Sequence, residues 1–144
     1  LPFTEALSQS VDPQLAAIGA KAVKESRYHF RRSRDWVLRL GDGTEESHQR
    51  CQRALDELWI YTGELFETDS QVQDLVARGI AVDAAAMAST WHETVAETLQ
   101  EATLVVPAGE VNVIGGRSGI HTDDLGFLLA ELPFMQRAYP GLQW

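Results

Sequence analysis

The sequence predicts an all-α fold, an antiparallel bundle of helices joined by short loops. Hydrophobic residues recur at spacings of three and four over most of the 144 residues, which is the periodicity of a half-buried helix. Residues typical of helix starts and ends bracket these segments, and the alternation typical of strands is scarce. Hydrophobic residues make up 44% of the chain, enough for a single domain over 1–144.

The first long helix is expected from Asp12 to Leu40. Asp12 is a favourable N-cap, and Pro13 suits the first helical position because its missing amide would be unpaired there in any case. Gly41 can end the helix. Before it, residues 3–10 form either the tail of a helix or a short helix.

The middle of the chain predicts two further helices. Thr44 can cap a helix that runs to about Glu67. A shorter helix, 70–78, should end at Gly79.

The last third alternates between helix and loop. Asp83 can cap a helix that continues to about Thr103. Residues 105–120 contain a proline and four glycines and predict a loop. Thr122 is expected to cap the last helix, which Pro133 should kink or end.

Composition excludes several classes of partner. The net charge is -9, which disfavours binding to nucleic acid or an anionic membrane through a general basic field. No apolar run approaches the roughly 20 residues of a membrane span, and no signal-peptide pattern is visible. Cys51 is the only cysteine, which suits a reducing compartment. We therefore expect a cytoplasmic protein.

Polar residues interrupt the stripe that heptad-like spacing places inside the bundle. Glu25, His29 and Arg32 fall in the middle of this stripe. An unpaired carboxylate in a core would cost several kcal/mol, so it needs a partner. The full stripe reads Leu15, Ile18, Ala22, Glu25, His29, Arg32, Trp36 and Leu40.

This stripe raises the question of a metal site. Ferritin-like di-iron proteins carry Glu-x-x-His on inward helices, but here Tyr28 stands three residues after Glu25, and His29 comes one position late. A dinuclear site needs about four carboxylates and two histidines, and the chain offers one pair. We expect no metal here and a charge pairing with Arg32 or with a basic residue elsewhere instead, although a weak mononuclear site through Glu25 and His29 stays open.

Two further sets of residues follow from the pattern. The loop before the last helix lacks the G-x-x-x-x-G-K-[ST] motif of phosphate-binding loops, so we do not expect a phosphate site there. Arg117 and His121 of this loop are instead candidate contacts with a partner chain. The expected buried core comprises Leu15, Ile18, Trp36, Leu55, Leu58 and Trp91.

Several ordered blocks also carry a resemblance to a known family. They include "DPQLAAIGAKAVKESRYHFRRSRDWVLRLGDGTEES", "ALDELWIYTGELF", "GRSGIHTDDLGFLLAEL" and "QRAYPGLQW". The chain resembles the C subunits of bacterial phenylacetyl-CoA epoxidases, the ring 1,2-monooxygenases of phenylacetate degradation. This resemblance implies a ferritin-like fold in a cytoplasmic multicomponent oxygenase, and it covers nearly the whole chain.

The resemblance also implies a division of roles. The A subunit of such an oxygenase holds the di-iron centre, whereas the C subunit lacks a working metal site, pairs tightly with A and is structural. We therefore expect no cofactor in this chain, a partner in the A subunit, and a homo- or hetero-oligomer. Members of the family carry further N-terminal helices, so this bundle is expected to lack them. The alternative is a metal-binding, di-iron-like oxidoreductase in its own right.

Overall fold

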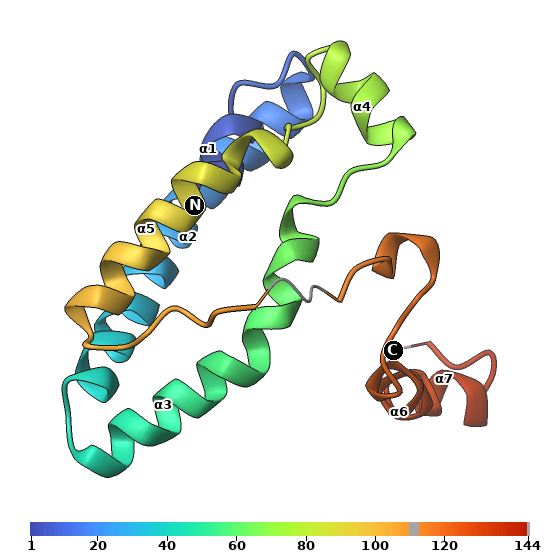
Figure 1. The fold of residues 1–144 in the computed structure, drawn as a ribbon. Helices are drawn as coiled ribbons and strands as arrows, with labels where there is room; N and C mark the ends of the chain where they lie inside the picture. Colours follow the sequence, from blue (N-terminus) through green and yellow to red (C-terminus); the bar gives the residue numbers. More distant parts are fainter. Residues whose placement is uncertain (110–112, 144) are drawn as a thin grey trace. The chain divides into compact units, whose positions relative to one another are not determined.

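A computed structural model describes residues 1–109 and 113–143 (Figure 1). Within these residues every regular element is a helix, so the all-α prediction is confirmed and is consistent with a ferritin-like bundle. The chain divides into two compact units, Leu1–Val113 and Ile114–Trp144. Each unit is described by itself, and the single domain over 1–144 stays a prediction.

The longest element is α2, Pro13–Gly41, and it begins where the sequence predicts. Asp12 is its N-cap, and Asp12 Oδ1 accepts the backbone amides of Gln14 at 2.9 Å and Leu15 at 3.0 Å. These two bonds satisfy amide donors that the first helical turn leaves unpaired. Gly41 is the last residue of the helix, and a short turn leads from it into the next helix.

The short helix α1, Pro2–Leu7, packs against α2 at Gly19. A Cβ atom added to Gly19 would lie 2.5 Å from the backbone nitrogen of Ser8, closer than a real Cβ contact. The two backbones can therefore approach only because Gly19 has no side chain. The hydroxyl of Ser10, just after α1, donates to the carbonyl of Ile80 at 2.7 Å, which ties this end of the unit to the segment that precedes α5.

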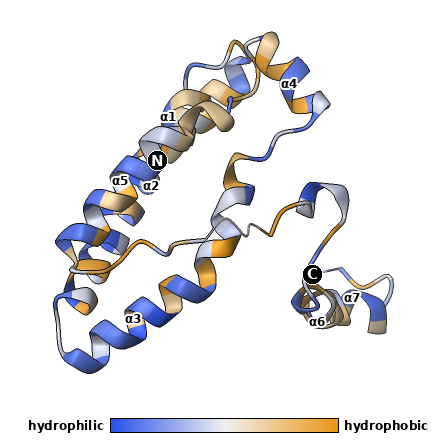
Figure 2. Ribbon diagram, viewed as in Figure 1, coloured by the Kyte–Doolittle hydropathy of each residue, from blue (hydrophilic) through white to orange (hydrophobic). Residues whose placement is uncertain are grey.

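The next helix, α3, spans Glu45–Leu58 and is shorter than expected. Thr44 caps it as predicted, accepting the amide of Ser47 at 3.2 Å. The chain then tightens into the 3₁₀ helix η1, Trp59–Phe66, instead of continuing as α-helix to Glu67. Its aromatic, β-branched and glycine residues are weaker helix formers than those before it. Figure 2 shows that hydrophilic residues predominate along α3.

Helix α5, Ala88–Glu101, packs against α2. It follows α4, Ser70–Ala77, and the 3₁₀ turn η2, Ala85–Met87. Helices α2 and α5 run parallel, because the segment through η1 and α4 carries the chain back to the start of α2 before α5 begins (Figure 1). The expected antiparallel order therefore applies to α2 and α3 across their turn, and not to α2 and α5.

The second unit contains η3, Gly116–Ser118, α6, Asp124–Glu131, and α7, Phe134–Ala138. Thr122 does not cap α6 as predicted. Its hydroxyl lies 3.4 Å from Oδ2 of Asp124 and donates to it, because a carboxylate is a strong acceptor for a neighbouring hydroxyl. Pro133 separates α6 from α7, as its missing amide predicts.

The buried core is small. Among the described residues, the buried hydrophobic side chains are Val82, Leu99, Ala102 and Leu104. Partly buried neighbours, including Val37, Leu55 and Trp59, pack around the last three.

Three of the six residues expected in the core are exposed to solvent. Ile18, Trp36 and Leu58 are 53%, 47% and 62% exposed, so the prediction that they are buried is wrong. Leu15, Leu55 and Trp91 are partly buried. The error on α2 arises because this helix packs through small residues such as Gly19 and Gly41, which places the contact stripe one position away from the expected one.

No helix in the described part of the chain is both long enough and apolar enough to cross a membrane.

Candidate functional site

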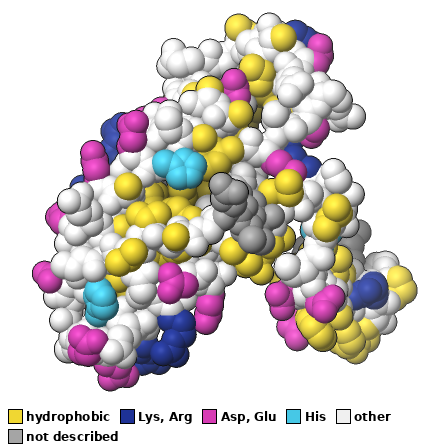
Figure 3. Space-filling model, in the orientation of Figure 1, with side chains coloured by type: hydrophobic (Ala, Val, Ile, Leu, Met, Phe, Trp, Pro, Cys, Tyr) yellow, Lys and Arg dark blue, Asp and Glu magenta, His cyan; other side chains and the backbone are white. Residues whose placement is uncertain are grey.

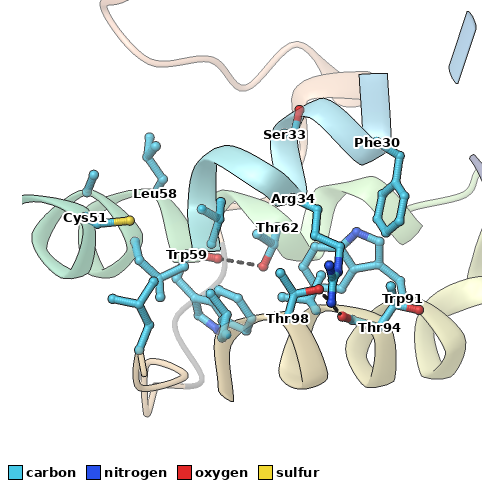
Figure 4. Close-up of a pocket in the computed structure, with 16 residues that line it drawn as sticks. Phe30, Ser33, Arg34, Cys51, Leu58, Trp59, Thr62, Trp91, Thr94 and Thr98 are labelled. Atoms are coloured by element: carbon cyan, nitrogen blue, oxygen red, sulfur yellow. Dashed lines mark hydrogen bonds between the residues drawn. The ribbon is translucent and has the colours of Figure 1, made fainter. Parts of the chain in front are cut away.

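The first unit contains an apolar groove bounded by α2, α3 with η1, and α5. Its cavity measures about 380 Å³. In Figure 3, hydrophobic side chains gather in the middle of the face that α3 and α5 border, and Figure 4 shows the residues that line the groove. Its walls include Phe30, Val37, Cys51, Leu55, Leu58, Trp59, Trp91, Val95 and Leu99.

Three threonines line the groove, and the hydroxyl of each already has a hydrogen-bond acceptor. Thr94 and Thr98 donate to the carbonyls four residues before them, at 2.8 and 2.9 Å. Thr62 donates to the carbonyl of Trp59 at 2.7 Å (Figure 4). Because each of these three hydroxyls donates inside its own helix, none of them needs an acceptor from whatever fills the groove. It is suited to an apolar surface.

Trp59 and Trp91 line the groove and belong to a larger cluster of aromatic rings. The ring centres of Trp59 and Trp91 lie 5.9 Å apart, and Phe66 meets Trp91 edge to face at 5.5 Å. His92 completes the cluster, 5.0 Å from the ring centre of Trp91. Aromatic pairs at these separations hold one another in defined positions, so Trp59 and Trp91 present a preformed surface to the groove.

One end of the groove is fixed by close backbone contacts. A Cβ atom added to Gly41 would lie 2.4 Å from the carbonyl oxygen of Ala102, and His48 Nδ1 donates to the carbonyl of Gly41 at 2.7 Å. The side-chain amide of Gln52 both donates to and accepts from the backbone of Val105, each at 2.9 Å. These contacts join α2, α3 and the end of α5.

The rim of the groove carries an ion pair. Arg34 of α2 bonds to the carboxylate of Glu101 on α5. Glu101 ends the acidic row that it forms with Glu93 and Glu97 on α5. The row therefore has a cationic neighbour, which the spacing along α5 alone does not reveal. Pairing leaves the guanidinium of Arg34 engaged at the edge of an otherwise apolar surface.

The predicted polar trio lies outside the core. His29 Nε2 and Glu25 Oε1 are 3.9 Å apart, and their side chains are 65% and 79% exposed. Arg32 is also exposed. The expectation that the trio is buried is therefore wrong, because the contact stripe of α2 runs one position away. Glu25 and His29 lie close to each other, but Arg32 forms no ion pair with a described residue. Among the residues that the structure describes, no three His, Cys, Asp or Glu side chains gather as a metal site would require.

The candidate partner contacts of the loop lie in the second unit. Arg117 belongs to η3, and both Arg117 and His121 are exposed. Glycines at positive φ bracket η3, Gly115 at 100° and Gly119 at 83°, and other residues adopt that backbone only with strain. That Arg117 and His121 contact a partner stays a prediction.

Sequence reasoning missed the groove itself. Phe30 and Thr94 line it, yet neither stands out as a functional residue in the sequence. The signal that could have found it was the pair Thr94 and Thr98, four residues apart on the face of α5 that also carries Trp91. Threonines at helical spacing beside tryptophan indicate an apolar helix face.

Comparisons with known proteins identify relatives of this chain. The family described as "Phenylacetic acid catabolic protein" matches residues 1–144. The C subunit of the 1,2-phenylacetyl-CoA epoxidase from Escherichia coli (strain K12) is 49% identical to this chain over 138 residues, which cover 96% of the chain. The match covers 56% of that relative, so the chain spans about half of its length.

Proposed function

Because the chain belongs to the phenylacetic acid catabolic protein family, we propose that it is a structural, non-catalytic subunit of a multicomponent phenylacetyl-CoA epoxidase. The similar protein from Escherichia coli bears the name of the C subunit of such an enzyme. The proposed partner is the catalytic A subunit, and the chain itself holds no cofactor. Its role is to stabilise that subunit in the assembled oxygenase.

This proposal rests on the contrast between a small buried core and a large exposed apolar surface in the first unit. The first unit buries few hydrophobic side chains, while the groove presents an apolar wall of tryptophan, phenylalanine and leucine. Water contact with such a surface costs roughly 25 cal/mol for each Å². Contiguous apolar patches of this kind mark protein interaction sites, which supports a subunit whose fold is completed by another chain.

The alternative function, a metal-dependent oxidoreductase, finds weaker support. It requires ligands that converge from several helices. Glu25 and His29 lie on one exposed helix face with their side chains in water, a geometry that would give at most a weak site.

The test is assembly with the catalytic subunit. Co-expression of the chain with that subunit, followed by size-exclusion chromatography with light scattering, should give one complex. Thr94→Lys places a cation in the groove and should abolish the complex. Thr90→Lys adds the same charge to an exposed position one turn earlier on α5, and should leave the complex intact.

Iron analysis separates the alternative. After expression with added iron, the chain alone should contain no stoichiometric metal. One iron per chain that disappears in Glu25→Gln and His29→Gln would instead establish the oxidoreductase function. Absence of any complex between the wild-type chain and the catalytic subunit would overturn the structural role.

A further inference from the structure

A second surface of α2 shares no residue with the groove. It is a shallow hollow of about 170 Å³ lined by Tyr28, Arg31, Arg32, Asp35, Trp36 and Arg39; we call it the arginine–tryptophan face. Building on the proposed function, we infer that this face docks an acidic surface of the catalytic subunit.

The aromatic residues of the arginine–tryptophan face are open to solvent. Tyr28 and Trp36 are 50% and 47% exposed, eight residues apart along the same side of α2. The guanidinium carbon of Arg39 lies 5.9 Å from the ring centre of Trp36, as in a cation–π contact. Tryptophan, tyrosine and arginine are the side chains that contribute most to binding at protein interfaces, so this combination is typical of a docking surface.

The charge of α2 opposes that of the rest of the chain. The helix holds seven of the twelve Lys and Arg residues and two of the twenty-one Asp and Glu residues, a net charge of +5 in a chain of net charge -9. Arg27 and Arg34 pair with glutamates of other helices.

The three arginines of the face behave differently. Arg31, Arg32 and Arg39 form no ion pair with any residue that the structure describes. Asp35 is the one carboxylate in the lining, so the face keeps an excess of positive charge. A guanidinium group binds a carboxylate through two parallel hydrogen bonds. Three such groups around two aromatic rings therefore complement a surface that presents carboxylates beside an apolar side chain.

The same charges argue against other occupants. A second copy of the arginine–tryptophan face would bring like charges together, so symmetric pairing through this face is disfavoured. A nucleic acid would meet the remainder of an acidic chain, which repels phosphates. The geometry favours an acidic protein surface.

Charge reversal tests the assignment. Arg31→Glu, Arg32→Glu and Arg39→Glu are combined in one variant. The matched control combines Arg50→Glu, Arg53→Glu and Arg78→Glu, all exposed and all outside α2, and changes the total charge equally. Affinity for the purified catalytic subunit is measured at low and high salt for wild type and both variants, and circular dichroism checks that each remains helical.

The face variant should bind at least about tenfold more weakly than wild type, whereas the control should stay within about threefold. Salt should weaken the wild type and leave the face variant nearly unchanged. Trp36→Ala, which removes no charge, should also lose about tenfold.

Four outcomes would overturn the inference, and they separate it from the proposed function. If wild type binds and both charge variants bind equally, the site lies elsewhere while the structural role stands. If the wild-type chain does not bind the catalytic subunit, both this inference and the proposed function are refuted. A change in the mass of the isolated chain in the face variant alone would assign the face to contacts between copies. Binding of duplex DNA by wild type, lost only in the face variant, would assign it to a polyanion.

Discussion

The contact between α1 and α2 gives a sharp prediction, because Gly19→Ala adds one methyl group at a place with no room for it. The added Cβ would meet Ser8 N at 2.5 Å, the carbonyl carbon of Leu7 at 2.7 Å and Ser8 Cα at 2.9 Å. All three atoms belong to the backbone of the chain at the end of α1, so no side chain can rotate away. The helices must separate, or α1 must detach.

Two opposing effects set the magnitude. Replacing glycine by alanine inside a helix is favourable by about 1 kcal/mol when nothing obstructs the methyl group. Overpacking a tight contact costs about 1–3 kcal/mol, and the upper part of this range applies because the obstruction is backbone. The free energy of unfolding of Gly19→Ala should therefore fall by about 1–2 kcal/mol. With a urea m-value of about 2 kcal/mol/M, the midpoint should drop by about 0.5–1 M.

Urea unfolding followed by far-ultraviolet circular dichroism measures this change. Gly126→Ala in α6 is the matched control, because no atom lies within 4 Å of its added Cβ, and it should gain up to about 1 kcal/mol from helix propensity. A Gly19→Ala variant that gains stability as the control does would refute the close approach of α1 to α2.

Three further changes follow from single contacts. Asp12→Ala removes the N-cap of α2 and should lower the free energy of unfolding, measured in urea, by about 1 kcal/mol. Asp12→Asn should keep most of the stability that the cap provides; equal losses in the two variants would argue against the cap. Gly79→Ala, at φ +71° with Val11 Cγ1 3.1 Å from the added Cβ, should lower the thermal midpoint, as strain of about 1 kcal/mol predicts; an unchanged midpoint would contradict it. Glu101→Gln breaks a partly exposed ion pair with Arg34 and should cost under about 1 kcal/mol, with the loss vanishing in high salt; a larger, salt-independent loss would show that the pair is more than a surface contact.

Local chemistry made the helix starts of the first unit predictable. Asp12 and Thr44 act as caps in the structure because their side chains reach amides only two or three residues away, a contact that the sequence alone specifies. Pro133 likewise interrupts the last helical segment through its own missing amide. Thr122 is not the cap because α6 begins one residue later than predicted: Asp123 holds the N-cap position with helical backbone angles, and its side chain makes no capping bond.

The inward face of α2 could not be predicted in the same way. A hydrophobic pattern favours large side chains such as Ile18 and Trp36, whereas the observed contacts use Gly19 and Gly41, where the neighbouring backbone comes closest. Which of two adjacent stripes is buried depends on residues far along the chain, such as Ala102. The candidate metal residues were displaced by the same one-position shift.

The four-residue core has a consequence for the fate of the chain in a cell. Among the residues that the structure describes, the buried hydrophobic side chains are only Val82, Leu99, Ala102 and Leu104, and so small a core gives a small reserve of stability. Binding adds stability that grows with the logarithm of partner concentration. If the chain is a subunit as proposed, copies made in excess of the catalytic subunit would spend longer unfolded and be removed first by proteases. Selective degradation would then by itself hold the two proteins at matched abundance.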